Sequence, residues 1–258
     1  MPRAQVDPER IRTGDLPFET AQLDAGIRAF FQQPVEGLPN LRIGQCKFGV
    51  YAFYDYDGEP IYVGQTNERL SGRVRRHLTN RRTDAVAMSV LDPYEVFSIE
   101  VWPLPEYQNA TKRDSRRWSD ACAHLSNLEA AVYLRCVAES RFNAVLNEKL
   151  PVATAEVPFP RSYSGGVVSE RVSALRDHPD IRIARRAATV ARLAAIISER
   201  SVKAGLRRTL AVQAKRLGHL ADQRFASFAA QAEAEDVSAE SEDVRMVAEG
   251  EKNARYGE

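Results

Sequence analysis

The sequence predicts an α+β protein in which a small three-stranded sheet, flanked by helices, precedes a helical C-terminal region. Three observations support this fold class. Two runs rich in β-forming and aromatic residues flank the pair Asp57-Gly58, which is a strong signal for a hairpin turn. Apolar residues at helical spacing precede and follow that hairpin. Beyond about residue 168 the chain becomes rich in alanine and arginine and shows no further strand pattern.

Composition divides the chain into five segments with different expected structures. The central one is an α+β domain, and its neighbours are a proline-containing N-terminal segment and a Pro-, Ser- and Gly-rich linker. A basic helical region follows, read as a helical hairpin or a pair of dimerisation helices, and then an acidic tail that is expected to be disordered because it has little apolar content. In chain order these segments are residues 1–44, 45–151, 152–168, 169–232 and 233–258.

The overall composition indicates a soluble globular protein. Hydrophobic residues make up 44% and charged residues 28% of the 258 residues, with a formal net charge of +1. The three cysteines, Cys46, Cys122 and Cys136, are odd in number and lack Cys-x-x-Cys spacing, so neither a disulfide framework nor a zinc site is indicated. No apolar run resembles a signal peptide or a membrane span. A cytoplasmic protein that does not enter membranes is therefore expected.

The hairpin is the element around which the rest of the domain is expected to fold. If the turn is centred on Asp57-Gly58, Gly64 faces Tyr51 and Tyr62 faces Phe53, and all four residues share one face of the sheet. Because Gly64 has no side chain, a pocket is expected beside the Tyr51 ring. Two phenols and a gap on one rigid surface could form a site. The alternative is an aromatic pair that only packs a core.

A helix is predicted after the hairpin, over residues 68–79. Its apolar stripe consists of Leu70, Val74 and Leu78, and a neighbouring polar stripe at i, i+4 and i+8 consists of Arg69, Arg73 and His77. The polar stripe is either a solvated basic face or a clamp for a phosphodiester, because the arginine fork matches phosphate oxygens. Further arginines nearby could contact a nucleic-acid backbone without reading its sequence: Arg75, Arg76, Arg81 and Arg82.

The third strand and the main helix are expected further along the chain. Alternating apolar residues over 94–104 predict a strand beside the hairpin, and residues 119–139 carry the stripe of a long helix. Glu129 lies at the margin of that stripe, next to Leu128. It is therefore either an exposed surface residue or a carboxylate that faces a site.

Taken together in order, these residues resemble the signature of GIY-YIG nucleases, over roughly residues 45–150. Gly49-Val50-Tyr51 and Tyr62-Val63-Gly64 stand for the two halves of the signature, with the tyrosines eleven residues apart. Arg73 and His77 follow where the family keeps an arginine and a histidine. An acidic helix residue and a later asparagine complete the set as Glu129 and Asn143.

The resemblance implies a role for each matched residue. Tyr51 would orient or deprotonate the attacking water, with support from Tyr62. Arg73 would bind the scissile phosphate, and His77 would assist proton transfer or bind a phosphate oxygen. Glu129 would hold one divalent cation, Mg²⁺ or Mn²⁺, whose shell is mostly water.

The position of the bracing asparagine is open in the sequence. Asn143 directly follows an aromatic residue, as in the family, and is preferred. Asn147 competes for the same role.

The function implied by the resemblance is a metal-dependent endonuclease that acts on DNA, with RNA not excluded. Residues 170–232 carry a net charge of +8 and residues 233–258 a net charge of −6. The basic region could form a homodimer or dock a partner protein, or grip nucleic acid, and such an appendage favours a role in restriction or antiviral defence. The alternatives are a non-catalytic nucleic-acid-binding or scaffold protein that uses the same fold, and a DNA-repair or RNA nuclease.

Overall fold

A computed structural model describes the backbone of residues 17–79 and 90–255 and the side chains of these residues up to 230. The chain forms two compact units, Met1–Arg216 and Leu217–Glu258, which we describe separately. The first unit contains every strand and all helices except the greater part of the last one. It is α+β, as the sequence predicts.

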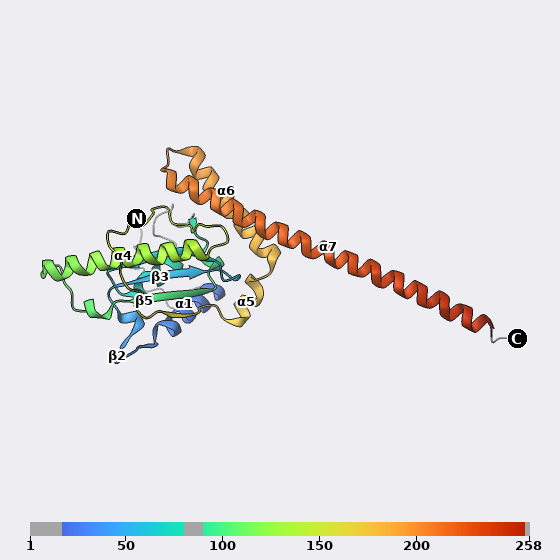
Figure 1. Ribbon diagram of the computed structural model, residues 1–258, viewed down its shortest axis with the longest axis horizontal. Coiled ribbons are helices and arrows are strands. Elements are labelled where there is room, and N and C mark those ends of the chain that lie inside the picture. The colour runs from blue at the N-terminus through green and yellow to red at the C-terminus, as the bar shows by residue number, and fades with distance from the viewer. Residues whose placement is uncertain (1–16, 80–89, 256–258) are drawn as a thin grey trace, which may run out of the picture. The chain divides into compact units, whose positions relative to one another are not determined.

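The main sheet, in which Figure 1 labels β3 and β5, is antiparallel and has the strand order β4-β3-β5-β6. Its strands are β3 (Gly49–Tyr54), β4 (Pro60–Thr66), β5 (Ser98–Pro103) and β6 (Tyr163–Gly166). The hairpin register follows the prediction, because Tyr51 pairs with Gly64 and Phe53 pairs with Tyr62. Strand β4 lies at one edge of the sheet.

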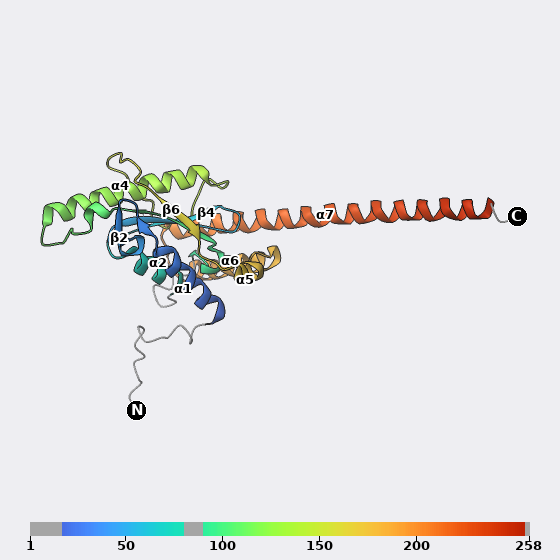
Figure 2. The ribbon, with the colours of Figure 1, turned by 90° about the horizontal axis from the view of Figure 1, so that it is seen from below.

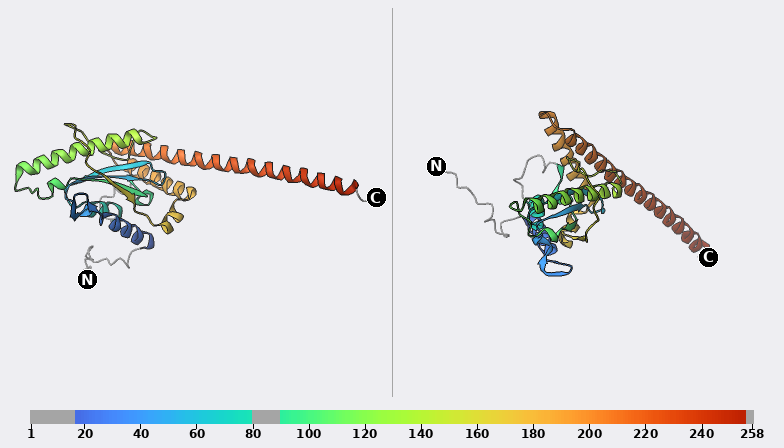
Figure 3. Two further views of the ribbon diagram at one scale, coloured as in Figure 1. Left: turned by 60° about the horizontal axis from the view of Figure 1, so that its bottom comes forward. Right: turned by 60° about the vertical axis from the view of Figure 1, so that its left-hand side comes forward.

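Helices cover both faces of this sheet (Figures 2 and 3). Helix α4 (Ser115–Glu139) packs on the face that carries Val50 and Ala52. Helices α1 (Phe18–Phe31) and α2 (Leu70–Thr79) contribute to the core on the face that carries Tyr51 and Phe53. The alternation of side chains along β3 thus supplies two cores, which explains why this strand contains almost no polar residue.

Short elements connect the main ones. A two-stranded sheet precedes the hairpin, and three 3₁₀ helices flank the strands in the part of the chain that the structure describes. These elements are β1 (Pro34–Val35), β2 (Leu38–Arg42), η3 (Ile43–Gln45), η4 (Pro93–Glu95) and η5 (Pro105–Tyr107). Within the described residues, no helix is both long enough and apolar enough to cross a membrane.

Several boundaries differ from the sequence prediction: α2 begins at Leu70 instead of residue 68, and β5 occupies only Ser98–Pro103 of the predicted 94–104. Two larger differences have identifiable causes. Helix α4 begins at Ser115 rather than at Ser119, because the Asp114 side chain accepts a hydrogen bond from the Arg117 backbone and caps the helix. The main sheet has a fourth strand, β6, inside the predicted linker, where Tyr163 pairs with Val101 and Gly166 with Ser98. In the segment Tyr-Ser-Gly-Gly only Tyr163 favours a strand, and pairing with β5 makes the segment a strand.

Three helices follow β6: α5 (Glu170–Arg176), α6 (Pro179–Glu199) and α7 (Ala204–Arg255). The backbone of α7 remains helical to Arg255, so the predicted disorder of the acidic tail is not what the structure shows. The tail is rich in alanine and glutamate, which favour helix in the absence of tertiary contacts. The second unit, from Leu217 onward, consists of this helix.

A buried ion network fastens α6 and the first part of α7 to the turn end of the hairpin. The Asp55 carboxylate, 1% exposed, accepts hydrogen bonds from Arg216 at 2.6 Å and from Arg186 at 3.0 Å. Arg186 also binds Glu95 at 2.8 Å, and Arg182 forms an ion pair with Asp57. The three arginines are 2–3% exposed.

The network shows that three arginines of the basic region are buried against acids of the α+β domain, so a nucleic acid or a dimer partner would have to contact the region's other basic residues. Its arginines offset acids of the α+β domain. Two more arginines do the same: the buried Arg176 binds Glu19, and the half-buried Arg185 binds Asp92. Helices α5 and α6 and the start of α7 are therefore part of the first unit and not a separate appendage.

Candidate active site

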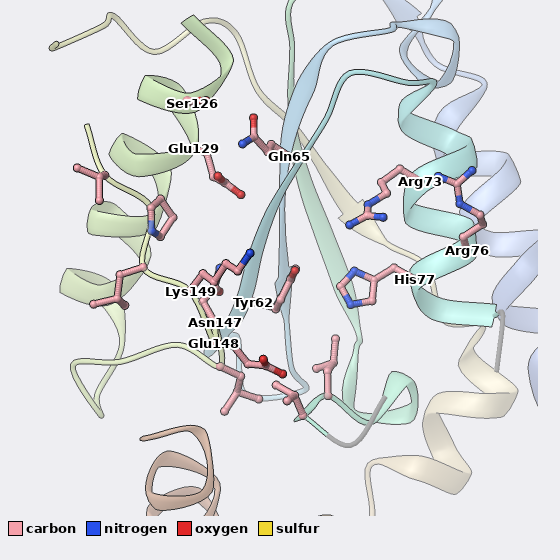
Figure 4. Close-up of a pocket in the computed structure, with 16 residues that line it drawn as sticks. Tyr62, Gln65, Arg73, Arg76, His77, Ser126, Glu129, Asn147, Glu148 and Lys149 are labelled. Atoms are coloured by element: carbon pink, nitrogen blue, oxygen red, sulfur yellow. The ribbon is translucent and has the colours of Figure 1, made fainter. Parts of the chain in front are cut away.

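A pocket of about 700 Å³ lies at the free edge of β4, where side chains from α2 and α4 meet. Figure 4 shows Glu129 on α4 on one side, Arg73 and His77 on α2 on the other, and Tyr62 between them. Four of the six predicted site residues therefore line one hollow. The polar residues of the lining are Tyr62, Gln65, Arg73, Arg76, His77, Ser126, Glu129, Asn147, Glu148 and Lys149.

Asn147 closes the edge of the sheet at the second half of the tyrosine motif. Its side-chain oxygen accepts a hydrogen bond from the Val63 N–H at 3.0 Å, and its amide nitrogen donates to the Val63 carbonyl at 2.7 Å. Next to it, the Leu146 N–H donates to the Ile61 carbonyl at 2.8 Å. Asn147 is 6% exposed and thus replaces a missing neighbour strand. Its two hydrogen bonds to the Val63 backbone hold this part of β4, including the neighbouring Tyr62, in position.

Asn143, the preferred asparagine in the sequence, is not at this site. Its side chain is exposed, it does not line the pocket, and its backbone has φ +49° in the turn that follows α4. Asparagine tolerates this left-handed conformation better than most residues, so its position is explained by the turn. The bracing role proposed for Asn143 therefore moves to Asn147.

Replacing Asn147 by alanine is expected to lower the free energy of unfolding by about 2–6 kcal/mol. The substitution leaves a buried N–H and a buried carbonyl of Val63 without their partners, and each costs about 1–3 kcal/mol. Chemical denaturation measures the loss. Asn143→Gly is the matched control and should change stability by less than about 0.5 kcal/mol, since glycine accepts a positive φ. Equal losses in the two variants would contradict the assignment.

Tyr51 lies beneath the pocket rather than in it. It is 0% exposed and does not line the hollow. A Cβ atom on Gly64 would come within 2.6 Å of the Tyr51 ring and hydroxyl, so the space left by glycine is filled by the ring itself. The pocket expected beside that ring does not form there. The absence of a side chain at Gly64 instead allows the Tyr51 ring to lie over the paired strand β4.

Burial raises the pKa of both tyrosines, so both are neutral near pH 7. For Tyr51 the burial effect exceeds the opposing charge and hydrogen bond of Arg73. The pKa of Tyr62 is also raised, mainly by burial. Neither phenol is therefore a base in the protein as it stands, and each is available as a hydrogen-bond donor.

His77 connects the two tyrosines to α2. Its Nδ1 atom lies 3.3 Å from the Tyr51 hydroxyl, and its ring meets the Tyr62 ring edge to face with centroids 4.6 Å apart. Burial, with a smaller contribution from the charge of Arg73, lowers the pKa of His77 to about 4. The imidazole is neutral at pH 7 and can accept a proton.

Acidification is expected to destabilise the fold through His77. Its pKa falls from 6.5 to about 4 on folding, so the unfolded chain binds the proton more tightly. Stability is intact above pH 6.5 and is lost as the pH falls toward 4, by about 2 kcal/mol at pH 5. The measurement is the loss of unfolding free energy between pH 7.5 and pH 5 in wild type and in His77→Gln. The variant should lose about 2 kcal/mol less, and an identical loss would show that His77 is not buried neutral.

Glu129 is a carboxylate whose charge is only partly compensated. Desolvation raises its pKa to about 7, against the opposing effects of a hydrogen bond from Gln65 and the charge of Arg73. A bound cation would offset this desolvation, and carboxylate oxygen is the ligand type that Mg²⁺ and Mn²⁺ prefer. The described residues contain no cluster of three or more His, Cys, Asp or Glu side chains suited to a metal. Glu129 would thus act as a single protein carboxylate, which fits a hydrated Mg²⁺.

The five arginines predicted to contact a nucleic-acid backbone lie in different surroundings. Arg76 lines the pocket and pairs with Glu68, whereas Arg69 is exposed just before α2 and outside the lining. Arg75 forms an ion pair with the buried Asp24 of α1, so its position is explained by packing. Arg81 and Arg82 lie outside the described residues.

Four polar residues of the pocket were not among the predicted site residues: Gln65, Ser126, Glu148 and Lys149. Gln65 directly follows the second glycine of the hairpin motif and binds Glu129. Lys149 follows Asn147 in the segment that closes the β4 edge. The adjacency of Gln65 to the motif is a usable sequence signal, whereas the position of Lys149 depends on a tertiary contact that no local pattern reveals.

Comparison with known proteins agrees with this geometry. Residues 47–113 match the family model of the GIY-YIG catalytic domain. The matched range contains the hairpin, Arg73 and His77, while Glu129 and Asn147 lie beyond it. No curated protein and no solved structure matches the chain significantly.

Proposed function

We propose that this chain, which contains a GIY-YIG catalytic domain over residues 47–113, is an endonuclease that hydrolyses DNA phosphodiester bonds in the pocket at the β4 edge. That domain indicates a nuclease-type endonuclease family. The observation that carries the proposal is the pocket itself, in which Arg73, His77 and Tyr62 face a carboxylate, Glu129, from another helix (Figure 4). Opposed cationic and anionic groups around one hollow suit phosphoryl transfer.

Arg73 is the residue that we assign to the scissile phosphate. Its guanidinium presents several donors in one plane, which match two phosphate oxygens and stabilise the charge that builds up as water attacks. Tyr51 hydrogen-bonds to Arg73 from below and also contacts His77. Tyr51 is therefore a positioning residue for both, in place of the water-activating role that the resemblance suggested for it.

His77 and Tyr62 are the residues that we assign to the attacking water. His77 is neutral, because its pKa is about 4, and a phosphate next to it would raise its proton affinity. It can therefore accept the proton that water loses. The neutral Tyr62 hydroxyl can donate a hydrogen bond that orients the water or a phosphate oxygen. Asn147 holds the strand that carries Tyr62.

Glu129 is the residue that would hold Mg²⁺ or Mn²⁺, with Gln65 keeping its carboxylate in place. When bound, such an ion polarises the phosphate and stabilises the leaving oxygen. The raised pKa of Glu129 supports this assignment, because a carboxylate kept partly desolvated gains most from a nearby cation.

The biological setting of the activity comprises the cell compartment, the pathway and any partner protein. The free thiols Cys46, Cys122 and Cys136 fit a reducing compartment such as the cytoplasm. A role in restriction or antiviral defence rests on the basic helical region, where two of the 13 lysines and arginines of residues 170–232, Arg186 and Arg216, bind Asp55 in the interior. The same ion pairs weaken the case for a homodimer or partner protein at residues 169–232.

Cleavage of plasmid DNA tests the proposal. Wild-type protein is incubated with supercoiled plasmid in Mg²⁺, Mn²⁺ or EDTA, in parallel with a structured RNA. Metal-dependent nicking that Glu129→Ala loses by at least about 100-fold is the expected result. Glu139→Ala, at the exposed end of the same helix, is the matched control and should cut like wild type. If all three proteins fail to cut, or if Glu129→Ala cuts at the wild-type rate, the proposal is wrong.

A further inference from the structure

The pocket has a second half that the proposed chemistry does not use. Apart from the polar residues described above, its lining is apolar and comes from two separate segments. These residues are Val90, Leu91, Leu146, Leu150, Pro151 and Val152. Phosphate hydrolysis needs donors, a base and a cation, none of which an aliphatic wall provides. The apolar half therefore needs its own explanation.

This half is held in place by the start of α7, within the first unit. Gln213 donates a buried hydrogen bond to the Val90 carbonyl at 2.8 Å. Arg208 donates to the carbonyls of Asn147 and Glu148 at 3.1 and 3.0 Å. Gly205 packs so closely on Glu148 that a Cβ atom would lie 2.1 Å from its carbonyl oxygen. One helix thus positions both segments that form the apolar wall.

Charge and exposure indicate what this wall would contact. Three cationic side chains, Arg73, Arg76 and Lys149, line the hollow together with two carboxylates, Glu129 and Glu148. Because the cations outnumber the carboxylates, an anionic group is favoured on the side of the hollow that carries Arg73. Leu150 is 50% exposed and Val152 is 75% exposed, so both offer apolar surface to water until a ligand covers it. A nucleotide combines an anionic phosphate with a largely apolar, planar base, and it matches both halves of the pocket at once.

We infer that the apolar half binds an unpaired nucleobase next to the phosphate that is cut. This inference rests on the proposed nuclease function. Bases in an intact duplex are stacked inside the helix and cannot reach Leu150 while a phosphate lies at Arg73. The preferred substrate class is thus DNA with an unstacked nucleotide at the cleavage position, such as a bulge, a flap or a single strand.

The inference predicts a preference for unpaired DNA in both binding and cleavage. Two labelled oligonucleotide duplexes of one sequence are compared, one fully paired and one with a single bulged nucleotide. Wild-type protein in Mg²⁺ should cut the bulged duplex at least about tenfold faster, and Glu129→Ala, which does not cut, should bind it about tenfold more tightly. A tenfold preference is within the range that contact with one base provides.

Variants of the apolar wall separate this inference from general DNA binding. The double variant Leu150→Ser, Val152→Ser should lose most of the preference for the bulged duplex. Both residues are surface-exposed, so the variant should fold, which its thermal unfolding curve checks. Leu134→Ser is the matched control, because Leu134 is also exposed, at 61%, but lies on α4 outside the pocket lining. It should retain the wild-type preference.

Each outcome decides one of the two claims. Equal cutting and equal binding of the paired and bulged duplexes by wild type would overturn the base-binding inference while leaving the nuclease intact. The same holds if the wall variant keeps the full preference. If wild type cuts neither duplex yet binds the bulged one more tightly, through Leu150 and Val152, the base site stands and the nuclease proposal falls.

Discussion

Replacing Asp55 by asparagine is expected to lower the free energy of unfolding by about 3–5 kcal/mol. Asp55 is the shared partner of Arg186 and Arg216 and lies 3.9 Å from Arg182. Arginine cannot lose its proton in a protein, so removal of the carboxylate charge leaves buried guanidinium groups in mutual repulsion. Breaking a buried ion pair by removing one member carries a cost of this size.

Chemical denaturation of wild type and Asp55→Asn at neutral pH checks the prediction. The control is Glu139→Gln, which breaks an exposed ion pair with Arg135 and should cost less than about 1 kcal/mol. Because the network joins α6 and α7 to the hairpin, we also expect Asp55→Asn to reduce DNA cleavage through the pocket segments that α7 holds. A loss of stability no larger than that of Glu139→Gln would show that the network does not fasten these helices.

Replacing Arg73 by alanine is expected to lower kcat/KM for DNA cleavage by about 100- to 1000-fold, the range seen when a group that stabilises transition-state charge is removed. Arg73→Lys should recover only part of the rate, because lysine keeps the charge without the planar fork. The pKa of His77 should rise in Arg73→Ala, since the charge of Arg73 is one cause of its depression. Rates under single-turnover conditions and the titration of the His77 ring by NMR measure these effects.

Arg75→Ala is the matched control for this variant, because Arg75 is two residues away on α2 and pairs with Asp24 instead of lining the pocket. It should cut DNA within about threefold of wild type, since Asp24 keeps its second partner, Arg28. Comparable losses of activity in Arg73→Ala and Arg75→Ala would mean that general basic charge on α2, and not a phosphate ligand, is what cleavage requires.

The sheet and most of the site could be predicted from local sequence. The turn at Asp57-Gly58 sets the register of β3 and β4, and the register places Tyr51 opposite Gly64. Helical spacing places Arg73 and His77 on one side of α2. Glu129 needed the resemblance to GIY-YIG nucleases, because its local pattern also fits an exposed residue. These positions could be predicted because the interacting residues are close in the sequence or because a motif fixes their order.

The remaining features depend on contacts between distant segments. Asn147 is distinguished from Asn143 only by its two hydrogen bonds to Val63 across the sheet edge. Strand β6 owes its conformation to pairing with β5. A net charge count cannot separate arginines that face solvent from those that bind Asp55 in the interior. Three of the arginines that composition assigns to a basic region, Arg182, Arg186 and Arg216, are therefore interior ion-pair partners.

The central claim is that the pocket at the β4 edge performs chemistry and does not only bind DNA. The most direct test measures, on one oligonucleotide, both the Kd and the cleavage rate of wild type and Glu129→Ala. We predict that the variant binds with a Kd within about threefold of wild type but cuts at least about 100 times more slowly. Unchanged cleavage in Glu129→Ala, or tight binding by both proteins with no metal-dependent cleavage by wild type, would contradict the claim and favour a non-catalytic nucleic-acid-binding or scaffold role.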